Sequence, residues 1–215
     1  LPSPEIAELL SKAGFDWLFI DMEHSSITLK DAQSMIQTAS PNAHCVVRVP
    51  GNDEIWLKRV LDIGPAGIII PQVNTMEQAQ YAVKFSKYPP VGRRSAGISR
   101  AHGYGLDFAR YIEEANDDTA VIVQCEHKES IQNLPEIIGV EGIDCIFVGP
   151  YDLSGSYNKL GKVDDTEIIN AIETIQKTCV EAGIPLGIFG GKPEAVLPYS
   201  KTGFNLIAMG LDVLM

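Results

Sequence analysis

The chain of 215 residues has few positive charges: 17 lysines and arginines stand against 28 aspartates and glutamates, for a net charge of -11. A nucleic-acid-binding domain carries a basic surface, so this balance argues against a nucleic-acid partner. No apolar run approaches the ~20 residues that a transmembrane helix needs. The chain also does not open with a basic segment followed by an apolar one, as a secretory signal peptide does. We therefore expect a cytoplasmic protein without a membrane partner.

Cysteine is scarce, and its spacing argues against two common uses. The four cysteines, Cys45, Cys125, Cys145 and Cys179, contain no Cys-x-x-Cys pair, so a zinc site is not expected. The first three lie in apolar, strand-like runs and the fourth lies on a predicted helix. Buried, reduced thiols are typical of a cytosolic enzyme rather than of a disulfide-bonded scaffold.

The chain does contain a regular alternation of helical and strand patterns. Short apolar, partly β-branched runs predict seven buried strands, near residues 17, 46, 68, 122, 146, 187 and 207. Amphipathic patterns lie between them and also before the first strand, where Ser3-Pro4-Glu5 has the residues of a helix start. Such alternation predicts parallel strands joined by crossover helices.

Two α/β architectures fit this alternation. Seven strands are one fewer than the eight that close a barrel, and the chain begins on a helix and stops after a strand. We therefore predict a (β/α)8 TIM barrel whose first strand and last helix are missing from the chain. The alternative is an open, doubly wound sheet, but no Gly-x-Gly-x-x-Gly turn follows an early strand. Residues 1–215 show no repeat or linker and are predicted to form a single domain.

One long stretch, residues 88–107, breaks the alternation. It is rich in proline and glycine and carries Arg93, Arg94, Arg100 and His102. Long irregular loops are uncommon inside compact domains and are often functional. The sequence does not decide whether Arg94 is structural or faces a substrate.

Two carboxylates, Glu126 and Asp152, each follow a predicted buried strand. In parallel α/β folds, the polar residues just past a strand lie at the carboxyl-terminal rim, where active sites are built. Two carboxylates that face one pocket repel each other unless a positive charge lies between them, so a divalent cation with hard oxygen ligands is one explanation. The other explanation is that each acid caps the helix that follows. Spacing alone does not choose between them.

Further candidate catalytic residues follow other strands and helices. His24, close to Asp21, is suited to general-base chemistry because imidazole titrates near neutrality. The planar fork of Arg48 suits a carboxylate or enolate oxygen, although an ion pair at the edge of the core would also explain it. Asp62 ends a predicted helix, where a carboxylate opposes the helix dipole, and this suggests a partner elsewhere in the fold. No lysine lies at a strand end, so a Schiff-base aldolase is not expected.

Taken together, these segments resemble the HpcH/HpaI aldolase family, the metal-dependent class II pyruvate aldolases. The matching segments follow the family order through nearly the whole chain: residues 14–17, 21–24, 48–50, 61–64, 70–75, 89–94, 124–126, 149–154 and 185–189. The resemblance implies a carbon–carbon lyase (EC 4.1.2.-) of aromatic or sugar-acid catabolism. Such an enzyme cleaves a 4-hydroxy-2-oxo acid reversibly to pyruvate and an aldehyde. Family members are homo-oligomers, built as dimer-based hexamers.

The resemblance also implies roles for particular residues. Glu126 and Asp152 bind a divalent metal ion (Mg²⁺, Mn²⁺ or Co²⁺), which polarises the keto group of the substrate as a Lewis acid. Arg48 lies against the enolate oxygen, and His24 handles the proton of the aldol hydroxyl through a metal-bound water. Asp62 resembles the acidic partner of that histidine.

Three more residues are assigned in the same way. By the resemblance, Asp21 shares the role of acidic partner to the histidine. Gln124 and the backbone near Ser154 contact pyruvate.

The chain departs from the family pattern at positions that bear on specificity. Tyr151 stands where the family usually has a small residue and would narrow the pocket beside Asp152. Ser95 replaces a usual glycine, and His127 follows Glu126 where a smaller residue is common. The aldehyde, the preferred metal and the stereochemistry therefore stay open.

Two other functions remain as alternatives. A CoA-thioester lyase of the citrate-lyase-β type should show basic residues arranged for the pyrophosphate, and only Arg93, Arg94 and Arg100 are available as a cluster. A non-catalytic binder of small acids should lack His24, Arg48 or an acidic ligand, and all of these are present.

Overall fold

The computed structural model describes residues 1–213. The chain divides into two compact units, one made of Leu1–Ile70 with Tyr81–Val121 and the other of Pro71–Gln80 with the chain from Ile122 onward. Of the three boundaries, one follows Ile70, and the other two fall inside helix α4 (Met76–Ser86) and strand β4 (Ala120–Cys125). Both units are therefore built from interleaved parts of the sequence.

The first unit contains a parallel sheet. Strand β1 (Trp17–Asp21) pairs with β2 (His44–Arg48), and β2 pairs with β3 (Gly67–Ile70). At the start of β4, the N–H of Ala120 donates to the carbonyl of Ala66 (3.0 Å). The register places Asp21 opposite Arg48 at the carboxyl ends of β1 and β2. Two of the predicted site residues are thus neighbours because of strand pairing.

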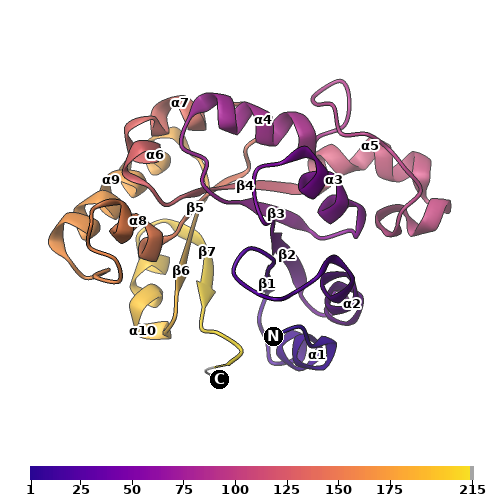
Figure 1. Ribbon diagram of the computed structural model, residues 1–215, viewed down its shortest axis with the longest axis horizontal. Helices are drawn as coiled ribbons and strands as arrows, with labels where there is room; N and C mark the ends of the chain where they lie inside the picture. Colours follow the sequence, from indigo (N-terminus) through magenta and orange to yellow (C-terminus); the bar gives the residue numbers. More distant parts are fainter. Residues whose placement is uncertain (214–215) are drawn as a thin grey trace. The chain divides into compact units, whose positions relative to one another are not determined.

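Helices of the first unit begin where the sequence supplies caps. They are α1 (Pro4–Lys12), α2 (Leu29–Ala39), α3 (Glu54–Asp62), α5 (Phe108–Asp118) and a short 3-10 segment, η1 (Arg100–Gly105). Ser3, Thr28 and Asp53 each accept backbone N–H groups at a helix start, and Thr28 forms a capping box with Asp31. Figure 1 shows α1 and α2 side by side next to β1 and β2.

The second unit also contains parallel strands. Within it, β4 pairs with β5 (Cys145–Val148), β5 with β6 (Leu186–Gly190) and β6 with β7 (Phe204–Met209). Cys125 lies opposite Val148, so the residues that follow these two strands begin at the same edge of the sheet.

The helices of the second unit are shorter than the sequence predicts in two places. They are α6 (Lys128–Gln132), α7 (Leu134–Ile138), α8 (Pro150–Ser156), α9 (Thr166–Ala182), α10 (Pro193–Val196) and the 3-10 segment η2 (Leu197–Lys201). The apolar pattern of the sequence predicts one helix around residues 131–138 and one over 192–201, but Pro135 and Pro198 lie at the starts of α7 and η2. Proline lacks the N–H that would continue the preceding helix, so it begins a new one.

The strand order is the sequence order, β1 to β7, and the strand pairs described above are all parallel. All seven predicted strands are present, and helices connect them (Figure 1). The prediction of an α/β fold of the TIM-barrel type is therefore confirmed. Among residues 1–213, no helix combines the length and apolar character needed to cross a membrane.

Gly187 on β6 has no room for a side chain. A Cβ built there would lie 2.9 Å from Cε2 of the buried Phe147 and 3.0 Å from the carbonyl oxygen of Leu206. We expect Gly187→Ala to lower the free energy of unfolding by about 1–3 kcal/mol, because the core would have to shift around the methyl group. Urea unfolding measures this. Gly191→Ala is the control, because a Cβ at Gly191 meets nothing within 4 Å. Equal decreases in the free energy of unfolding in the two variants would contradict a steric clash at Gly187.

Candidate active site

Arg48 is the centre of a charged group at the carboxyl ends of β1 and β2. Its guanidinium donates two parallel hydrogen bonds to Asp21, from Nε to Oδ1 (2.9 Å) and from Nη2 to Oδ2 (2.7 Å). Its Nη1 lies 3.1 Å from a carboxylate oxygen of Glu23, and the guanidinium lies over the ring of Phe19, 5.4 Å from its centroid. Since bidentate pairs fix geometry as well as adding energy, the Arg48 side chain has a defined orientation with 12% of its surface exposed.

Asp21 also shapes the turn that carries His24. Its Oδ1 accepts the backbone N–H groups of Glu23 (3.0 Å) and His24 (3.2 Å). Burial by itself would raise the pKa of Asp21, but Arg48 and these N–H groups together hold it below its ordinary value. Asp21 is therefore a fixed anion that holds Arg48 and the His24 backbone at once.

The imidazole of His24 is open to solvent. Its side chain is 65% exposed, and its Nε2 lies 3.8 Å from a carboxylate oxygen of Glu23. The structure thus brings Asp21, His24 and Arg48 together, as the strand ends predict. An exposed imidazole on a tethered backbone is accessible to a substrate.

Asp62 lies in the same unit with a different partner. It is the last residue of α3, and its Oδ1 accepts a hydrogen bond from Nη2 of Arg94 (2.9 Å). The sequence analysis expected a partner for Asp62 because its carboxylate opposes the helix dipole. That partner is Arg94, whose side chain is only 1% exposed. Arg94 has a structural role, which the sequence left undecided.

Glu126, in the second unit, is a buried carboxylate, 2% exposed, held by two donors. Its Oε1 accepts the backbone N–H of Gln72 (2.9 Å), and its Oε2 accepts a short hydrogen bond from the side-chain amide of Gln124. Helix α6 is capped instead by His127, whose Nδ1 accepts the N–H of Glu129 (3.2 Å). The alternative that Glu126 caps the following helix is therefore wrong.

Two backbone features around Glu126 were not predicted. Gln72 has a left-handed conformation with φ of 56°, which is costly for a residue with a side chain. Gly149, directly after β5, packs so closely that a Cβ would lie 2.9 Å from Oε2 of Glu126 and 2.8 Å from Nε2 of Gln124. An isolated glycine after a strand signals such a close approach. The positive φ of Gln72 has no such signal, because glutamine is not a residue type that favours this conformation.

The oxygen atoms near Glu126 suit a hard cation or a hydrogen-bond donor from a ligand. Oε1 of Gln124 is buried and has no hydrogen-bond partner in the described chain, and such an atom is costly unless a ligand satisfies it. Asp152 lies in the first turn of α8, three residues after Gly149. Within residues 1–213, no cluster of three or more His, Cys, Asp or Glu residues could hold a metal ion. A metal site here would therefore take at most two of its ligands from protein carboxylates.

Ser154 and Tyr151 are held by the connection between α8 and α9. The hydroxyl of Ser154 donates to the carbonyl of Tyr151 (2.6 Å) and accepts the N–H of Gly161 (2.9 Å). The ring of Tyr151 covers Gly161, where a Cβ would lie 3.2 Å from Oη. Because the Ser154 hydroxyl is occupied, a pyruvate contact at this position would have to come from the backbone. The Tyr151 ring packs on this turn, and its effect on specificity stays a prediction.

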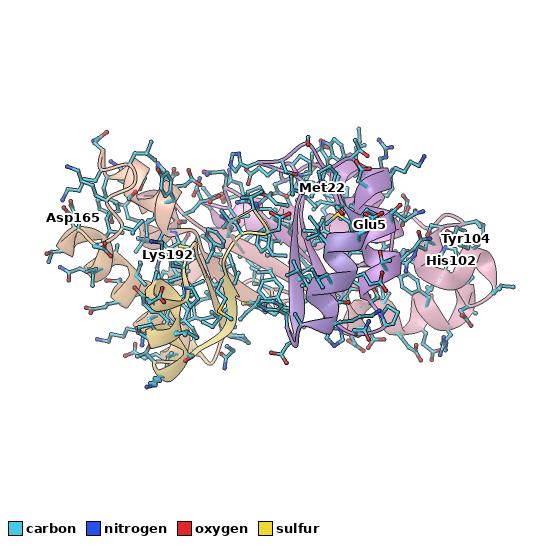
Figure 2. All side chains as sticks on the ribbon, turned by 90° about the horizontal axis from the view of Figure 1, so that it is seen from below. Glu5, Met22, His102, Tyr104, Asp165 and Lys192 are labelled. Carbon is cyan, nitrogen blue, oxygen red and sulfur yellow. The ribbon has the colours of Figure 1, made fainter. Side chains whose placement is uncertain are left out.

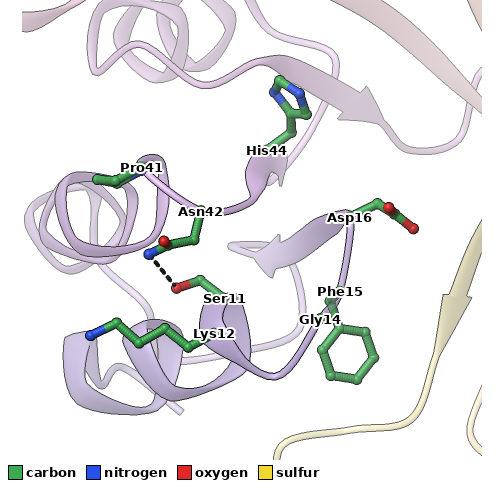
Figure 3. Close-up of a pocket in the computed structure, with 8 residues that line it drawn as sticks. All are labelled: Ser11, Lys12, Gly14, Phe15, Asp16, Pro41, Asn42 and His44. Atoms are coloured by element: carbon green, nitrogen blue, oxygen red, sulfur yellow. Dashed lines mark hydrogen bonds between the residues drawn. The ribbon is translucent and has the colours of Figure 1, made fainter.

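A polar hollow lies at the other end of the first unit's strands. It is lined by residues at or just before the starts of β1 and β2: Ser11, Lys12, Gly14, Phe15, Asp16, Pro41, Asn42 and His44. Figure 3 shows the hydrogen bond from Asn42 to Ser11 (3.4 Å) across it. None of the predicted site residues lines this hollow, which opens at the amino-terminal ends of the strands, whereas Asp21 and Arg48 lie at the carboxyl ends.

The comparisons with known proteins agree with one another. The sequence model of the HpcH/HpaI aldolase/citrate lyase family matches residues 1–215. The chain is 40% identical over 215 residues to a 2-dehydro-3,6-dideoxy-6-sulfogluconate aldolase of Pseudomonas putida, covering 99% of this chain and 84% of that one. It is 36% identical to a 4-hydroxy-2-oxo-heptane-1,7-dioate aldolase of Shigella sonnei, covering 99% and 82%.

A solved structure gives the same result. The crystal structure of an HpcH/HpaI aldolase/citrate lyase family protein from Burkholderia cenocepacia superposes with a TM-score of 0.95 at 35% identity, covering 99% of this chain and 86% of that chain. Fold and strand-end chemistry together define an α/β enzyme of the TIM-barrel type. The chain belongs to the HpcH/HpaI aldolase/citrate lyase family, and the sequence-based recognition of an aldolase of this family is confirmed.

Proposed function

We propose that this aldolase cleaves a 4-hydroxy-2-oxo acid reversibly to pyruvate and an aldehyde with the help of a divalent metal ion. The observation that carries the proposal is the buried group of Glu126 and Gln124, which offers a carboxylate and an unsatisfied amide oxygen in a chain of this family. The names of the two relatives describe aldolases of a sulfonated sugar acid and of a hydroxy-oxo diacid, and we extend these two substrate classes to this chain as candidates.

The metal would be held by Glu126 and Asp152, with its remaining ligands from solvent and substrate. When bound, Mg²⁺, Mn²⁺ or Co²⁺ supplies Lewis-acid chemistry that makes the carbon next to the keto group more acidic. Oxygen ligands of this type suit hard divalent ions. Gln124 and the backbone near Ser154 are proposed to contact the pyruvate part of the substrate.

The charged group of the first unit has roles in moving protons and stabilising charge. His24 takes the proton from the C4 hydroxyl as the C3–C4 bond breaks, and the electron pair of that bond passes to the pyruvate enolate. Arg48, held rigidly by Asp21, donates to the oxygen on which negative charge develops. A donor held in place in this way needs no reorganisation during the reaction, which is the basis of electrostatic catalysis. The role of Asp62 as the acidic partner of His24 rests on the family resemblance alone, because α3 runs back from the carboxyl end of β2 and ends near the start of β3, away from the turn that carries His24.

The CoA-thioester lyase is the weaker reading. Two of the three loop arginines that could meet a pyrophosphate are already engaged in the protein: Arg94 by Asp62, and Arg100 by the carbonyl of Ile63 (2.6 Å). Only Arg93 of the three is exposed.

Deuterium exchange into the methyl group of pyruvate tests the proposal without knowledge of the aldehyde. Exchange followed by NMR should be fast with Mg²⁺ or Mn²⁺ and should stop when EDTA removes the metal. Exchange that continues in EDTA would contradict the metal requirement. No exchange with any of the three metals would contradict pyruvate enolisation itself.

Three further properties remain proposals. We infer that residues 1–215 act as one aldolase domain, because the family model spans them all. The dimer-based hexamer rests on the family resemblance. The four cysteines, all free and buried, support a reducing, cytoplasmic location.

A further inference from the structure

We propose that Glu23 is a positioning residue for both His24 and Arg48. Its carboxylate orients the guanidinium and balances the positive charge that the imidazole gains when it takes a proton. The inference rests on the proposed function, in which His24 receives the proton of the C4 hydroxyl and Arg48 donates to the enolate oxygen. It assigns the acidic partner of His24 from contacts within one unit.

Glu23 reaches the charged group because of the alternation of side chains at the end of β1. Successive side chains of an extended chain point to opposite sides. Met22, labelled in Figure 2, is 6% exposed, and its N–H donates to the carbonyl of Arg48 (3.0 Å). Asp21 and Glu23, on either side of Met22, both reach the guanidinium of Arg48. The end of the strand thus delivers two carboxylates to one arginine.

One carboxylate oxygen of Glu23 faces two candidate catalytic side chains. Its Oε2 lies 3.1 Å from Nη1 of Arg48 and 3.8 Å from Nε2 of His24. The Glu23 side chain is only 16% exposed, so solvent and salt screen these interactions less than at an open surface. The longer distance exceeds a hydrogen bond, and contacts of this kind tighten when the reacting complex forms. Glu23 is therefore placed to act on both side chains.

The other two carboxylates considered for this role have different partners. Both oxygens of Asp21 accept from the guanidinium of Arg48, and its Oδ1 also accepts the backbone N–H groups of Glu23 and His24. Asp62 lies at the end of α3, where it accepts from an arginine of its own. Of the three carboxylates, Glu23 is the one with an oxygen near the imidazole of His24.

The charges of this group are arranged to receive a proton. With His24 neutral, Asp21 and Glu23 contribute two negative charges and Arg48 contributes one positive charge. The remaining negative charge is balanced once the imidazole is protonated. Because a neighbouring carboxylate stabilises a protonated imidazole, Glu23 lowers the free energy of the state in which His24 holds the substrate proton. Glu23 does this without touching the substrate.

Glu23→Gln tests the contact, because it removes the charge and keeps an oxygen that can accept from Arg48. NMR of protein labelled with ¹³C at its histidine rings follows the protonation of His24 without any substrate, and His24→Gln assigns the signal. In Glu23→Gln, half of this imidazole should be protonated at a pH about 0.5–1 unit lower than in the wild type, the effect of losing a unit charge about 4 Å away. Glu113→Gln, at an exposed glutamate of α5, is the matched control and should leave that pH unchanged.

Kinetics show whether the contact matters for the reaction. The probe is 4-hydroxy-2-oxo-heptane-1,7-dioate, the compound in the name of the Shigella sonnei relative, whose cleavage gives pyruvate and succinic semialdehyde. We expect Glu23→Gln to lower kcat about 3–10-fold, a fraction of what general-base catalysis contributes. The acid limb of the kcat/KM profile should move to lower pH by the interval that NMR measures.

Deuterium exchange into pyruvate separates the two roles of Glu23. Exchange forms the enolate without a C4 hydroxyl, and so without the proposed role of His24. It should change less than about threefold in Glu23→Gln, because Asp21 still holds Arg48 by two hydrogen bonds. A larger effect on cleavage than on exchange is therefore the expected signature.

Two further variants separate charge from packing. Glu23→Asp keeps the charge on a shorter side chain and should restore part of kcat and of the acid limb. Adding Glu23→Gln to His24→Gln should cost less than about twofold in cleavage, because residues that act through one another are not additive. Thermal unfolding of each variant separates a loss of stability from a loss of rate.

Several results would overturn the inference. One is that His24 takes its proton at the same pH in Glu23→Gln and in Glu113→Gln. Another is that cleavage and exchange fall by the same factor, or that the costs of Glu23→Gln and His24→Gln multiply in the double variant. A wild-type protein that neither cleaves the diacid nor exchanges pyruvate protons would overturn the proposed function and this inference with it. An active wild type in which Glu23→Gln behaves as Glu113→Gln does overturns the inference alone.

Discussion

Replacing Glu126 by glutamine is expected to lower the rate of pyruvate proton exchange at least about 100-fold, and to weaken Mn²⁺ binding by a similar factor. Glutamine has the same shape but lacks the negative charge that a divalent cation requires. The two oxygens of Glu126 accept from the N–H of Gln72 and the amide of Gln124. A glutamine would turn an NH₂ group toward one of these donors. Two facing donors leave buried groups unsatisfied, so we also expect the unfolding free energy to fall by about 1–3 kcal/mol.

Mn²⁺ titration followed by electron paramagnetic resonance measures the affinity independently of turnover. Glu129→Gln is the matched control, since Glu129 lies three residues away on α6 with a side chain 51% exposed. It should bind Mn²⁺ as wild type does. Unchanged Mn²⁺ affinity in Glu126→Gln would remove Glu126 from the metal site, even if activity fell through instability.

Replacing Arg48 by alanine is expected to slow pyruvate proton exchange by about 10²–10³-fold, the usual cost of removing one donor to a developing oxyanion. Metal binding should be nearly unchanged, because Arg48 is not a proposed ligand. The measurement is again methyl deuterium exchange by NMR, at saturating metal. Arg110→Ala, which removes an arginine 68% exposed on α5, is the control. If Arg48→Ala exchanged the pyruvate protons as fast as Arg110→Ala does, Arg48 would serve only the ion pair with Asp21.

The same substitution should also change how stability depends on pH. In the wild type the folded-state pKa of Asp21 lies below its ordinary value. The ionised group therefore adds stability above the unfolded-state pKa, roughly 3.9, and this contribution disappears as the pH falls through the folded-state pKa. Without Arg48 the carboxylates of Asp21 and Glu23 lose their guanidinium partner. We expect Arg48→Ala to be about 1–3 kcal/mol less stable than wild type at pH 7.

Urea unfolding at several pH values measures this difference. It should be full at pH 7 and should shrink as the pH falls from about 4, near the unfolded-state pKa, through the lower folded-state pKa of Asp21. A difference that stays constant down to pH 3 would mean that lost packing, and not the charge pair, sets the stability of the variant.

Much of the fold could be predicted because its signals are local. The strand runs around Val46, Ile68 and Ile146 are apolar along their whole length, which is typical of strands buried on both faces. Helix starts at Thr28 and Asp53 and the helix end at Gly183, with φ of 72°, carry their caps in the sequence itself. The short helix α8 had a weaker signal, because Gly149 before it supplies no side-chain cap and Gly155 lies within its seven residues.

The candidate site could be predicted less completely. Asp21, Arg48 and Glu126 could be identified as candidate site residues because each lies at the carboxyl end of a predicted strand. The helix dipole indicated that Asp62 needs a partner, but Arg94 lies 32 positions away in a loop without periodicity, so no pattern could name it.

By itself, the sequence determined the α/β class, the seven strands, the family and the residue types at the strand ends, because each depends on local composition and spacing. Only the tertiary structure decided which groups meet. It paired Asp21 with Arg48, joined Arg94 to Asp62, and placed the Gln72 N–H and Gly149 against Glu126. Such contacts depend on backbone conformations and chain crossings that packing of the whole unit selects. One residue's chemistry does not encode them.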